Sequence, residues 1–350
     1  MKPKVLFGIL NWGLGHATRS IPLIKAYIEK DFEVAIASDG DALVFLKKEF
    51  PDLSFYKLPG YNVKYPYKSI FFNILRYLPN ILNAIIKENK EIKKIVESIK
   101  PDLIISDNRY GVRNKKVKSI IITHQINLRL TNKFLTKAGT ILNERLIKLF
   151  DELWIPDLEN NLLAGELSIV PESFNYHYLG ALSRFKYVKL KKKYDIAVVL
   201  SGPEPQRTYF EKKILNQFEN MSLKSIIVLG KMDEEKEWYL NDKVKVKSHA
   251  LSDELNDILN RSELIVSRSG YSTVMDLVVL KKKAVLIPTP GQSEQEYLAE
   301  YLKQKKMFYC MDQELFDINI ALKKAEDYST VIIHKRLEEI LNSINYGLSA

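Results

Sequence analysis

Short apolar runs alternate with longer amphipathic segments along the first half of the chain. Runs of strand length stand at Val5–Leu10, Phe32–Ser38, Leu103–Ser106 and Ser119–Thr123. Apolar residues recur at helical spacing in the segments between them, as after the loop NWGLGHATR. Short, almost wholly apolar runs are typical of strands buried on both faces, and strands that alternate with helices predict a parallel, doubly wound sheet.

The same alternation of predicted strands and helices begins again in the second half of the chain. Strands are predicted at Ile196–Leu200, Ser225–Leu229, Val244–Lys247, Leu264–Val266 and Ala284–Ile287. The stretch LSRFKYVKLKKKY between the two halves is polar and basic, as an interdomain linker should be.

We therefore predict an α/β protein of two Rossmann-like, doubly wound domains. The first takes residues 1–182, the linker 183–194 and the second 195–329, while a last helix within 330–350 packs back on the first domain. Open α/β sheets bind ligands outside the carboxyl ends of their strands, so two such domains predict a central cleft between them.

Charge is distributed unevenly over a chain that is long enough for two cores. Of 350 residues 46% are hydrophobic, and the net charge is +10. Residues 1–150 hold 26 Lys and Arg against 13 Asp and Glu, a net +13, which leaves −3 for the remainder. A basic half predicts an anionic partner: nucleic acid, an acidic membrane face or a phosphorylated acceptor. The single cysteine, Cys310, and a first strand without a charged leader lead us to expect the cytoplasm.

Residues 65–87 form the most apolar stretch that also carries interleaved basic residues. Arg76, Pro79 and several asparagines interrupt it, so it is too broken to span a bilayer. It is either a helix packed on its domain or an interfacial helix in peripheral contact with an anionic membrane. The side chains that would then face lipid are Phe71, Phe72, Leu75, Leu78 and Leu82.

A glycine-containing loop, SRSGYSTVMD, follows a predicted strand of the second half and opens a helix. Gly270 lets the backbone approach a ligand, and Ser272 and Thr273 are residue types that cap helix N-termini. The unpaired N–H groups and dipole of a helix N-terminus attract phosphate. Asp276 stands about one turn on, where it could accept hydrogen bonds from ribose hydroxyls; an ordinary capped helix is the alternative.

Two further loops lie at carboxyl ends of strands in this half. The turn TPGQSEQEY offers Gln295 and Glu296, planar polar groups suited to sugar hydroxyls. The strand IAVVL runs into Ser201 and Gly202 of SGPEPQR.

Taken together, these loops resemble the C-terminal domain of the MurG-like glycosyltransferases of family 28, which have the GT-B architecture. The resemblance implies a UDP-sugar donor, with Asp276 at the ribose and the backbone of Leu251 at the base. Asp276 stands where the family has glutamate and Glu296 where it has glutamine, which leaves the donor sugar open. The implied donor-binding residues are Ser201, Gly202, Leu251, Ser269, Gly270, Ser272, Thr273, Asp276, Gln295 and Glu296.

The first half resembles the same family on its acceptor side. GLGHATR is similar to the family's glycine-rich first loop, and THQINLRLTNKFLTKAG is similar to its HEQN segment and the residues after it. The glutamate of HEQN is absent, since Gln125 comes directly after His124. The implied acceptor-side residues are Gly13, Gly15, His124 and Asn127.

His16 is the candidate general base, because transfer requires an acceptor hydroxyl to lose a proton. Asp107, at the end of a strand, is its expected partner; the alternative is a loop-shaping histidine and a capping aspartate, and His124 is the second candidate base. The resemblance implies inversion, no metal and no cofactor, with the UDP-sugar as co-substrate. We expect transfer of N-acetylglucosamine or another hexose to a lipid-linked or envelope glycan at the inner face of the plasma membrane.

Rival classes have weaker support from the sequence. Gly13 and Gly15 satisfy two positions of the dinucleotide-binding GxGxxG pattern, but Thr18 replaces the third glycine, so an NAD-dependent dehydrogenase is an alternative only. A UDP-sugar 2-epimerase would share the fold and donor. No recognition-helix pattern supports nucleic acid binding. Asp39-Gly40-Asp41 is expected to be a turn rather than a metal site.

Overall fold

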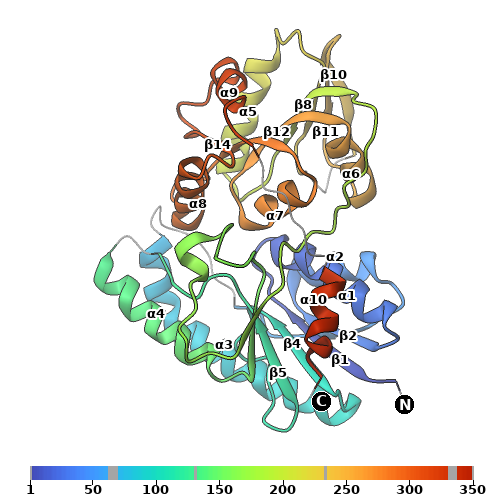
Figure 1. Ribbon diagram of the computed structural model, residues 1–350, viewed down its shortest axis with the longest axis vertical. Coiled ribbons are helices and arrows are strands. Elements are labelled where there is room, and N and C mark those ends of the chain that lie inside the picture. The colour runs from blue at the N-terminus through green and yellow to red at the C-terminus, as the bar shows by residue number, and fades with distance from the viewer. Residues whose placement is uncertain (1, 62–69, 130–131, 232–234, 330–336, 349–350) are drawn as a thin grey trace. The chain divides into compact units, whose positions relative to one another are not determined.

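The computed structural model describes residues 2–61, 70–129, 132–231, 235–329 and 337–348, with the backbone alone for 70–78. The chain divides into two compact units (Figure 1). The first runs to Leu182 and includes the C-terminal helix α10 (Leu337–Ser343), and the second begins at Ser183.

A seven-stranded parallel sheet forms the centre of the first unit, in the order β3-β2-β1-β4-β5-β6-β7. All four predicted strands are present as β1, β2, β4 and β5. The short strands β3, β6 and β7, toward the two sides of the sheet, were not predicted. The strand order reverses between β1 and β4, the switch point at which such sheets bind ligands. The strands are β1 (Lys4–Ile9), β2 (Glu33–Ser38), β3 (Ser54–Lys57), β4 (Leu103–Asp107), β5 (Lys118–Ile122), β6 (Glu152–Ile155) and β7 (Tyr176–Tyr178).

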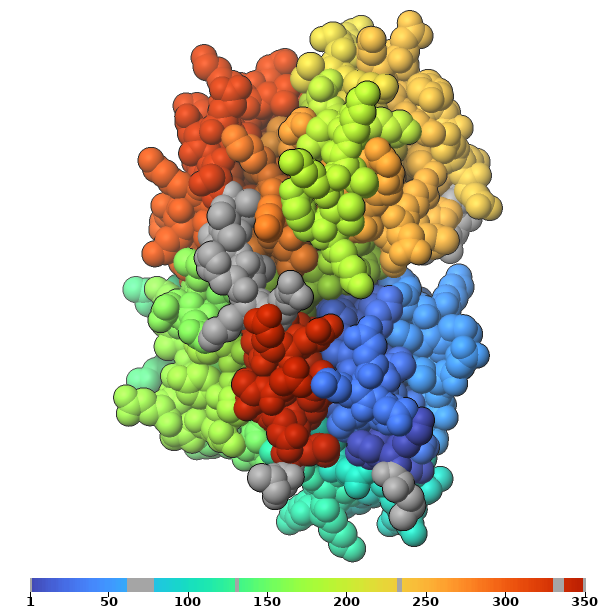
Figure 2. Space-filling model, turned by 45° about the vertical axis from the view of Figure 1, so that its right-hand side comes forward, coloured from blue at the N-terminus to red at the C-terminus, as the bar shows by residue number. Residues whose placement is uncertain are grey.

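Helices cover this sheet and bury an apolar core against it. The described helices, besides α10, are α1 (Gly15–Glu29), α2 (Gly40–Glu49), α3 (Ile70–Ile99) and α4 (Lys133–Ile147). Ile92 and Ile95 of α3 pack on Leu6 of β1 and Ile104 of β4. Figure 2 shows the C-terminal segment, in red, beside the blue N-terminal residues. The Tyr27 hydroxyl of α1 donates a hydrogen bond to the Tyr346 carbonyl, which holds this segment on the first unit.

The second unit repeats the design, with the sheet order β10-β11-β9-β8-β12-β13-β14. Only β10 runs antiparallel, and the switch point lies between β8 and β12. The five predicted strands are present. They are β8 (Tyr194–Val199), β9 (Ser225–Val228), β11 (Val244–Lys247), β12 (Ser262–Arg268) and β13 (Lys283–Ile287), joined by β10 (Glu237–Asn241) and β14 (Tyr309–Cys310). The helices are α5 (Gln206–Phe218), α6 (Ser252–Asn260), α7 (Tyr271–Val279), α8 (Ser293–Gln304) and α9 (Ile318–Ala325).

Residues 183–193 carry no helix or strand and lie along α6. The backbone N–H of Lys186 donates to Asn256 Oδ1 at 3.1 Å and that of Val188 to Asn260 Oδ1 at 2.9 Å. The Asn260 amide in turn donates to the Lys186 carbonyl at 3.0 Å. This segment is therefore held by the second unit along its length.

The apolar stretch 65–87 is helical from Ile70 onward, within α3. Residues 62–69 and the side chains of Phe71, Phe72, Leu75 and Leu78 lie outside the described residues. Further along the helix, Leu82 and Ile86 are exposed. Within the described part of the chain, no helix has the length and apolar character needed to cross a membrane.

Candidate active site

His16 and Asp107 meet at the switch point of the first unit. His16 stands at the start of α1, directly after the loop that follows β1, and Asp107 is the last residue of the neighbouring strand β4. His16 Nδ1 lies 2.8 Å from Asp107 Oδ1. The structure thus brings together the two residues that the sequence suggested as a pair.

Arg19 and Ser20, which the sequence analysis did not single out, complete the coordination of Asp107. Arg19 Nε donates to Asp107 Oδ2 at 2.9 Å, Arg19 Nη2 donates to Oδ1, and the Ser20 hydroxyl donates to Oδ2 at 3.0 Å. Burial would raise the pKa of Asp107, but the charge of Arg19 and the hydrogen bonds from Arg19 and His16 hold that pKa well below its usual value. The signal was available, because His16, Arg19 and Ser20 stand three and four residues apart on one helix face.

The other acceptor-side residues differ in what they contact. His124 is buried, and its Nδ1 lies 3.2 Å from Arg19 Nη1. The Asn127 amide donates to two carbonyls of the 3-10 helix Gly165–Ser168 and its C-cap, those of Glu166 and Ile169, each at 2.9 Å. Asn127 therefore fixes this segment of its own unit. Gly13 has a φ of +66° with open space beside it, and Gly15 is the first residue of α1.

The loop after β12 places the N-terminus of α7 at the switch point of the second unit. Gly270 is the N-cap residue, so the interpretation of Ser272 and Thr273 as caps was wrong; both lie inside the first turn. The chain turns into the helix one residue after Ser269, and no side chain caps it. The first-turn N–H groups of α7 are therefore not satisfied by a capping side chain, as an anion site requires.

Asp276 is connected to the N-terminus of α6 through two residues that the sequence analysis missed. Ser183 Oγ donates to Asp276 Oδ1 at 2.5 Å, and Arg184 Nη1 donates to Ser252 Oγ at 3.2 Å. Ser252 directly follows Leu251, a residue that is 65% exposed. Burial raises the pKa of Asp276 to about 7, against opposing contributions from the Ser183 hydrogen bond and the Arg184 charge.

Gln295 and Glu296 shape the turn before α8. Gln295 Oε1 accepts from the Thr289 N–H at 2.9 Å, and Gln295 Nε2 donates to Gln292. Glu296 Oε1 accepts from the Gly291 N–H at 2.8 Å. The Gln295 carbonyl also accepts from Ser269 Oγ at 2.9 Å, so this turn and the α7 loop are fastened together.

Arg268 is a buried cation without a carboxylate partner among the described residues. It is 1% exposed; Nη2 donates to the Gln206 carbonyl at 3.0 Å and to Gln313 Oε1 at 2.6 Å. Its guanidinium carbon lies 4.5 Å from the centroid of the Phe210 ring. Burial lowers the pKa of Arg268 to about 10, which leaves it charged at neutral pH.

Two neighbouring buried polar atoms, Arg268 Nε and Thr289 Oγ1, have no hydrogen-bond partner among the described residues. Both border Gly202, in the loop after β8: a Cβ at that glycine would lie 3.5 Å from Thr289 Oγ1 and 4.0 Å from Arg268 Nε. Gly202 has a φ of +107°, which favours glycine. Orphaned buried donors beside an unpaired cation are expected where a ligand anion completes the bonding.

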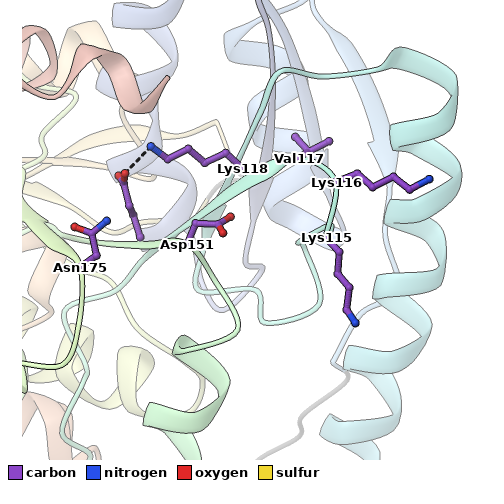
Figure 3. A pocket seen from close by; sticks show the side chains of 7 residues that line it. Lys115, Lys116, Val117, Lys118, Asp151 and Asn175 are labelled. Carbon is purple, nitrogen blue, oxygen red and sulfur yellow. Dashed lines mark ion pairs between the residues drawn. The ribbon is translucent and has the colours of Figure 1, made fainter. Parts of the chain in front are cut away.

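A cavity lies at the opposite edge of the first sheet (Figure 3) and includes no predicted site residue. It measures about 430 Å³ and opens at the amino ends of β5 and β6. One ion pair, Lys118 to Glu152 at 2.5 Å, crosses it. Its lining residues are Lys115, Lys116, Val117, Lys118, Asp151, Glu152 and Asn175.

The described residues contain no cluster of three or more His, Cys, Asp or Glu side chains that could hold a metal ion. In Asp39-Gly40-Asp41, Asp39 is the N-cap residue of α2 and pairs with Arg109 Nη1 at 2.6 Å. Gly40 has a φ of +50° and packs so closely on Asn11 that a side chain would collide with it. This segment is a helix start held by an ion pair.

Comparison with known proteins finds glycosyltransferases over both units. The model of the glycosyltransferase family 28 C-terminal domain matches residues 199–328, and that of glycosyl transferase family 1 matches residues 3–138.

Two curated relatives match over most of the chain. UDP-N-acetylglucosamine–N-acetylmuramyl-(pentapeptide) pyrophosphoryl-undecaprenol N-acetylglucosamine transferase of Buchnera aphidicola is 23% identical, covering 92% of this chain and 89% of the relative. An uncharacterized glycosyltransferase of Methanosarcina mazei is 21% identical, covering 86% and 84%.

Solved structures share the fold at low identity. The glycotransferase of kitacinnamycin superposes with a TM-score of 0.69 at 14% identity, covering 99% of this chain and 95% of that one. MurG of Acinetobacter baumannii superposes with a TM-score of 0.56 at 11% identity, covering 99% and 94%.

Two doubly wound units with GT-B glycosyltransferases as structural neighbours confirm the predicted GT-B fold. The matching family models and the curated relatives make the chain a glycosyltransferase. Residues 199–328 match the C-terminal domain of glycosyltransferase family 28, and the chain as a whole is similar to MurG-like glycosyltransferases. Both matching family descriptions are glycosyltransferases, so the dehydrogenase and epimerase alternatives gain no support.

Proposed function

We propose that this glycosyltransferase moves N-acetylglucosamine or another hexose from a UDP-sugar to a hydroxyl of a lipid-linked or envelope glycan, with inversion and without a metal or cofactor. The donor site is supported by the buried cation Arg268, which has no carboxylate partner among the described residues. Its Nε and the Thr289 hydroxyl, neither of them hydrogen-bonded within that part of the chain, lie around Gly202. A diphosphate supplies the charge and the acceptors that these two side chains lack.

The other donor contacts follow from the placement of the loops in the second unit. The N-terminus of α7, with Ser269 to Thr273, adds N–H groups and a positive dipole end to the diphosphate seat. Asp276 accepts from the ribose, the backbone at Leu251 reads the base, and Gln295 and Glu296 turn their remaining lone pairs to the sugar. The Buchnera relative's name specifies UDP-N-acetylglucosamine, which supports this donor class.

In the transfer step, the acceptor oxygen attacks the anomeric carbon while the bond from that carbon to the diphosphate oxygen breaks. The acceptor proton passes to His16 Nε2, because Asp107 holds Nδ1. Negative charge gathers on the leaving UDP, where Arg268 and the α7 N-terminus stabilise it, so we expect no metal requirement. Attack opposite the leaving group inverts the anomeric configuration.

The acceptor half rests on the basic first unit, whose residues 1–150 carry a net +13. We propose that this unit binds an anionic, lipid-linked acceptor and touches the inner face of the plasma membrane from the cytoplasm. Besides the stretch 65–87, helix α4 offers a second candidate surface for membrane contact, because Phe134 is 78% exposed and Ile141 43% exposed. Lys133, Lys137 and Arg145 of the same helix are exposed beside them, a pattern that suits an anionic interface.

Anionic vesicles should therefore retain the protein at low salt. We expect phosphatidylglycerol vesicles to sediment the wild type and phosphatidylcholine vesicles to leave it in solution. Phe134→Asp with Ile141→Asp should weaken retention at least about tenfold, since each apolar side chain adds about 1.5–3 kcal/mol when fully buried. Ile320→Asp, on an exposed apolar residue of α9 in the second unit, is the matched control. Equal loss in the control, or no retention of the wild type, would refute the membrane part.

Donor affinity should rise with pH across neutrality. The Asp276 carboxyl has a pKa of about 7, so below pH 7 it is mostly neutral and must lose its proton to accept from both ribose hydroxyls. We expect the association constant for UDP-N-acetylglucosamine, whose diphosphate has no titration near neutrality, to rise severalfold, approaching about tenfold, from pH 6 to pH 8. Isothermal titration calorimetry measures it, and Asp276→Asn should bind weakly without this pH dependence. An equally pH-dependent Asp276→Asn would remove Asp276 from the site.

A further inference from the structure

We propose that Arg19 holds His16 and His124 in opposite tautomers, which makes His16 the proton acceptor and His124 a hydrogen-bond donor. The catalytic meaning of this assignment rests on the proposed transfer reaction, whereas the tautomers themselves follow from the bonding around Arg19 and Asp107. These four side chains form one continuous array, from His16 through Asp107 and Arg19 to His124.

The tautomer of His16 follows from its hydrogen bond to the carboxylate of Asp107, which can only accept. Arg19 and Ser20 direct three N–H or O–H donors at the two carboxylate oxygens, and His16 Nδ1 is the fourth neighbour at 2.8 Å. An ionised carboxylate only accepts, so His16 Nδ1 must carry the proton. The neutral ring then presents its lone pair at Nε2, as a general base requires.

The tautomer of His124 follows from its contact with Arg19, which can only donate, so His124 carries its proton on the other ring nitrogen than His16 does. A guanidinium has five N–H donors and no acceptor, and Arg19 Nη1 lies 3.2 Å from His124 Nδ1. His124 Nδ1 must therefore accept, which places the proton of the neutral ring on Nε2. A proton on Nδ1 would point at the guanidinium and meet its positive charge.

This assignment separates the two candidate bases of the first unit. His124 has its basic nitrogen occupied by Arg19 and offers an N–H at Nε2, so it cannot serve as the proton acceptor. His16 keeps its basic nitrogen at Nε2. Arg19 is thus a positioning residue: it binds Asp107 with two nitrogens and fixes His124 with a third.

Nitrogen-15 NMR of the full-length protein reads these tautomers without substrate. Two-bond couplings from the ring protons distinguish a protonated from an unprotonated ring nitrogen, and His16→Gln and His124→Gln assign the signals among the five histidines. We expect the Nδ1–H form for His16 and the Nε2–H form for His124. In Arg19→Lys, which keeps a cation but cannot reach both partners, His124 should lose its single Nε2–H form while His16 retains Nδ1–H.

Two results would overturn the proposal: a wild-type His124 with its proton on Nδ1 or on both nitrogens, or an unchanged His124 signal in Arg19→Lys. If Arg19→Lys does not fold, as thermal unfolding would reveal, the wild-type spectrum alone decides the tautomers. UDP affinity, measured on the same samples, should stay unchanged because Arg19 lies in the first unit. If the wild type does not bind UDP, the proposed UDP-sugar donor is wrong, but the tautomer assignment is not affected. The NMR result and the UDP titration therefore test the two proposals separately.

Discussion

Replacing His16 with alanine is expected to lower glycosyl transfer by about 10²–10⁴-fold, the range of a general base. Affinity for UDP should stay within about twofold, because His16 lies in the first unit and the proposed donor residues lie in the second. UDP release from UDP-N-acetylglucosamine, with a panel of lipid-linked acceptors, measures the rate; calorimetry measures the affinity. His16 holds its Nδ1 2.8 Å from a fully coordinated carboxylate, so the alanine variant removes the base and leaves the Arg19–Asp107 pair in place.

The matched control is His177→Ala, which removes a histidine of β7 that takes no part in this array. Its transfer rate should equal that of the wild type. A His16→Ala protein that still transfers normally would show that His16 only shapes the loop. A joint loss of transfer and UDP affinity would indicate a structural role.

Replacing Arg268 with methionine is expected to weaken UDP binding by about 10–100-fold. Hydrogen bonds to charged groups contribute about 1.5–3 kcal/mol each, and Arg268 has no carboxylate partner within the described chain to take up its charge. Calorimetric titration with UDP gives the change. Arg261→Met, on an arginine of the same unit that is paired with Asp257, should bind UDP like the wild type.

Thr289→Val isolates the binding role of this site from folding, because it deletes only a hydroxyl of nearly the same volume. The Thr289 hydroxyl is buried and has no hydrogen-bond partner in the described part of the chain, so the free energy of unfolding should stay the same or rise. UDP affinity should fall about 10–100-fold if the hydroxyl donates to the diphosphate, since a hydrogen bond to a charged group contributes about 1.5–3 kcal/mol. Lower stability with unchanged UDP affinity would contradict the diphosphate seat.

The sequence predicted those features that depend on local pattern. The apolar runs of β1, β4, β8 and β12 marked the central strands, because a strand buried on both faces carries few polar residues. The edge strand β3 was not predicted, since its four residues are partly exposed and lack that signature.

The pairing of His16 with Asp107 was also accessible from the sequence, because the carboxyl ends of adjacent parallel strands meet at one edge. The role of Arg268 was not accessible, although this last residue of β12 stands within the SRSGYSTVMD segment singled out above. Arg268 is buried with no carboxylate partner in the described chain, and its Nε lies near the Thr289 hydroxyl, which likewise has no hydrogen-bond partner there. Those are properties of the packed unit rather than of any short pattern. Likewise, Ser272 and Thr273 are good capping types, but Gly270 already provides the extended backbone that starts α7.

The central claim, a UDP-sugar site in the second unit, is tested most directly by calorimetric titration of wild type and Arg268→Met with UDP, UDP-N-acetylglucosamine, UDP-glucose and NAD. We predict saturable binding of the UDP compounds by the wild type, at least about tenfold weaker binding by Arg268→Met, and no binding of NAD by either. Binding of NAD, absence of UDP binding, or equal UDP affinity in the two proteins would contradict it.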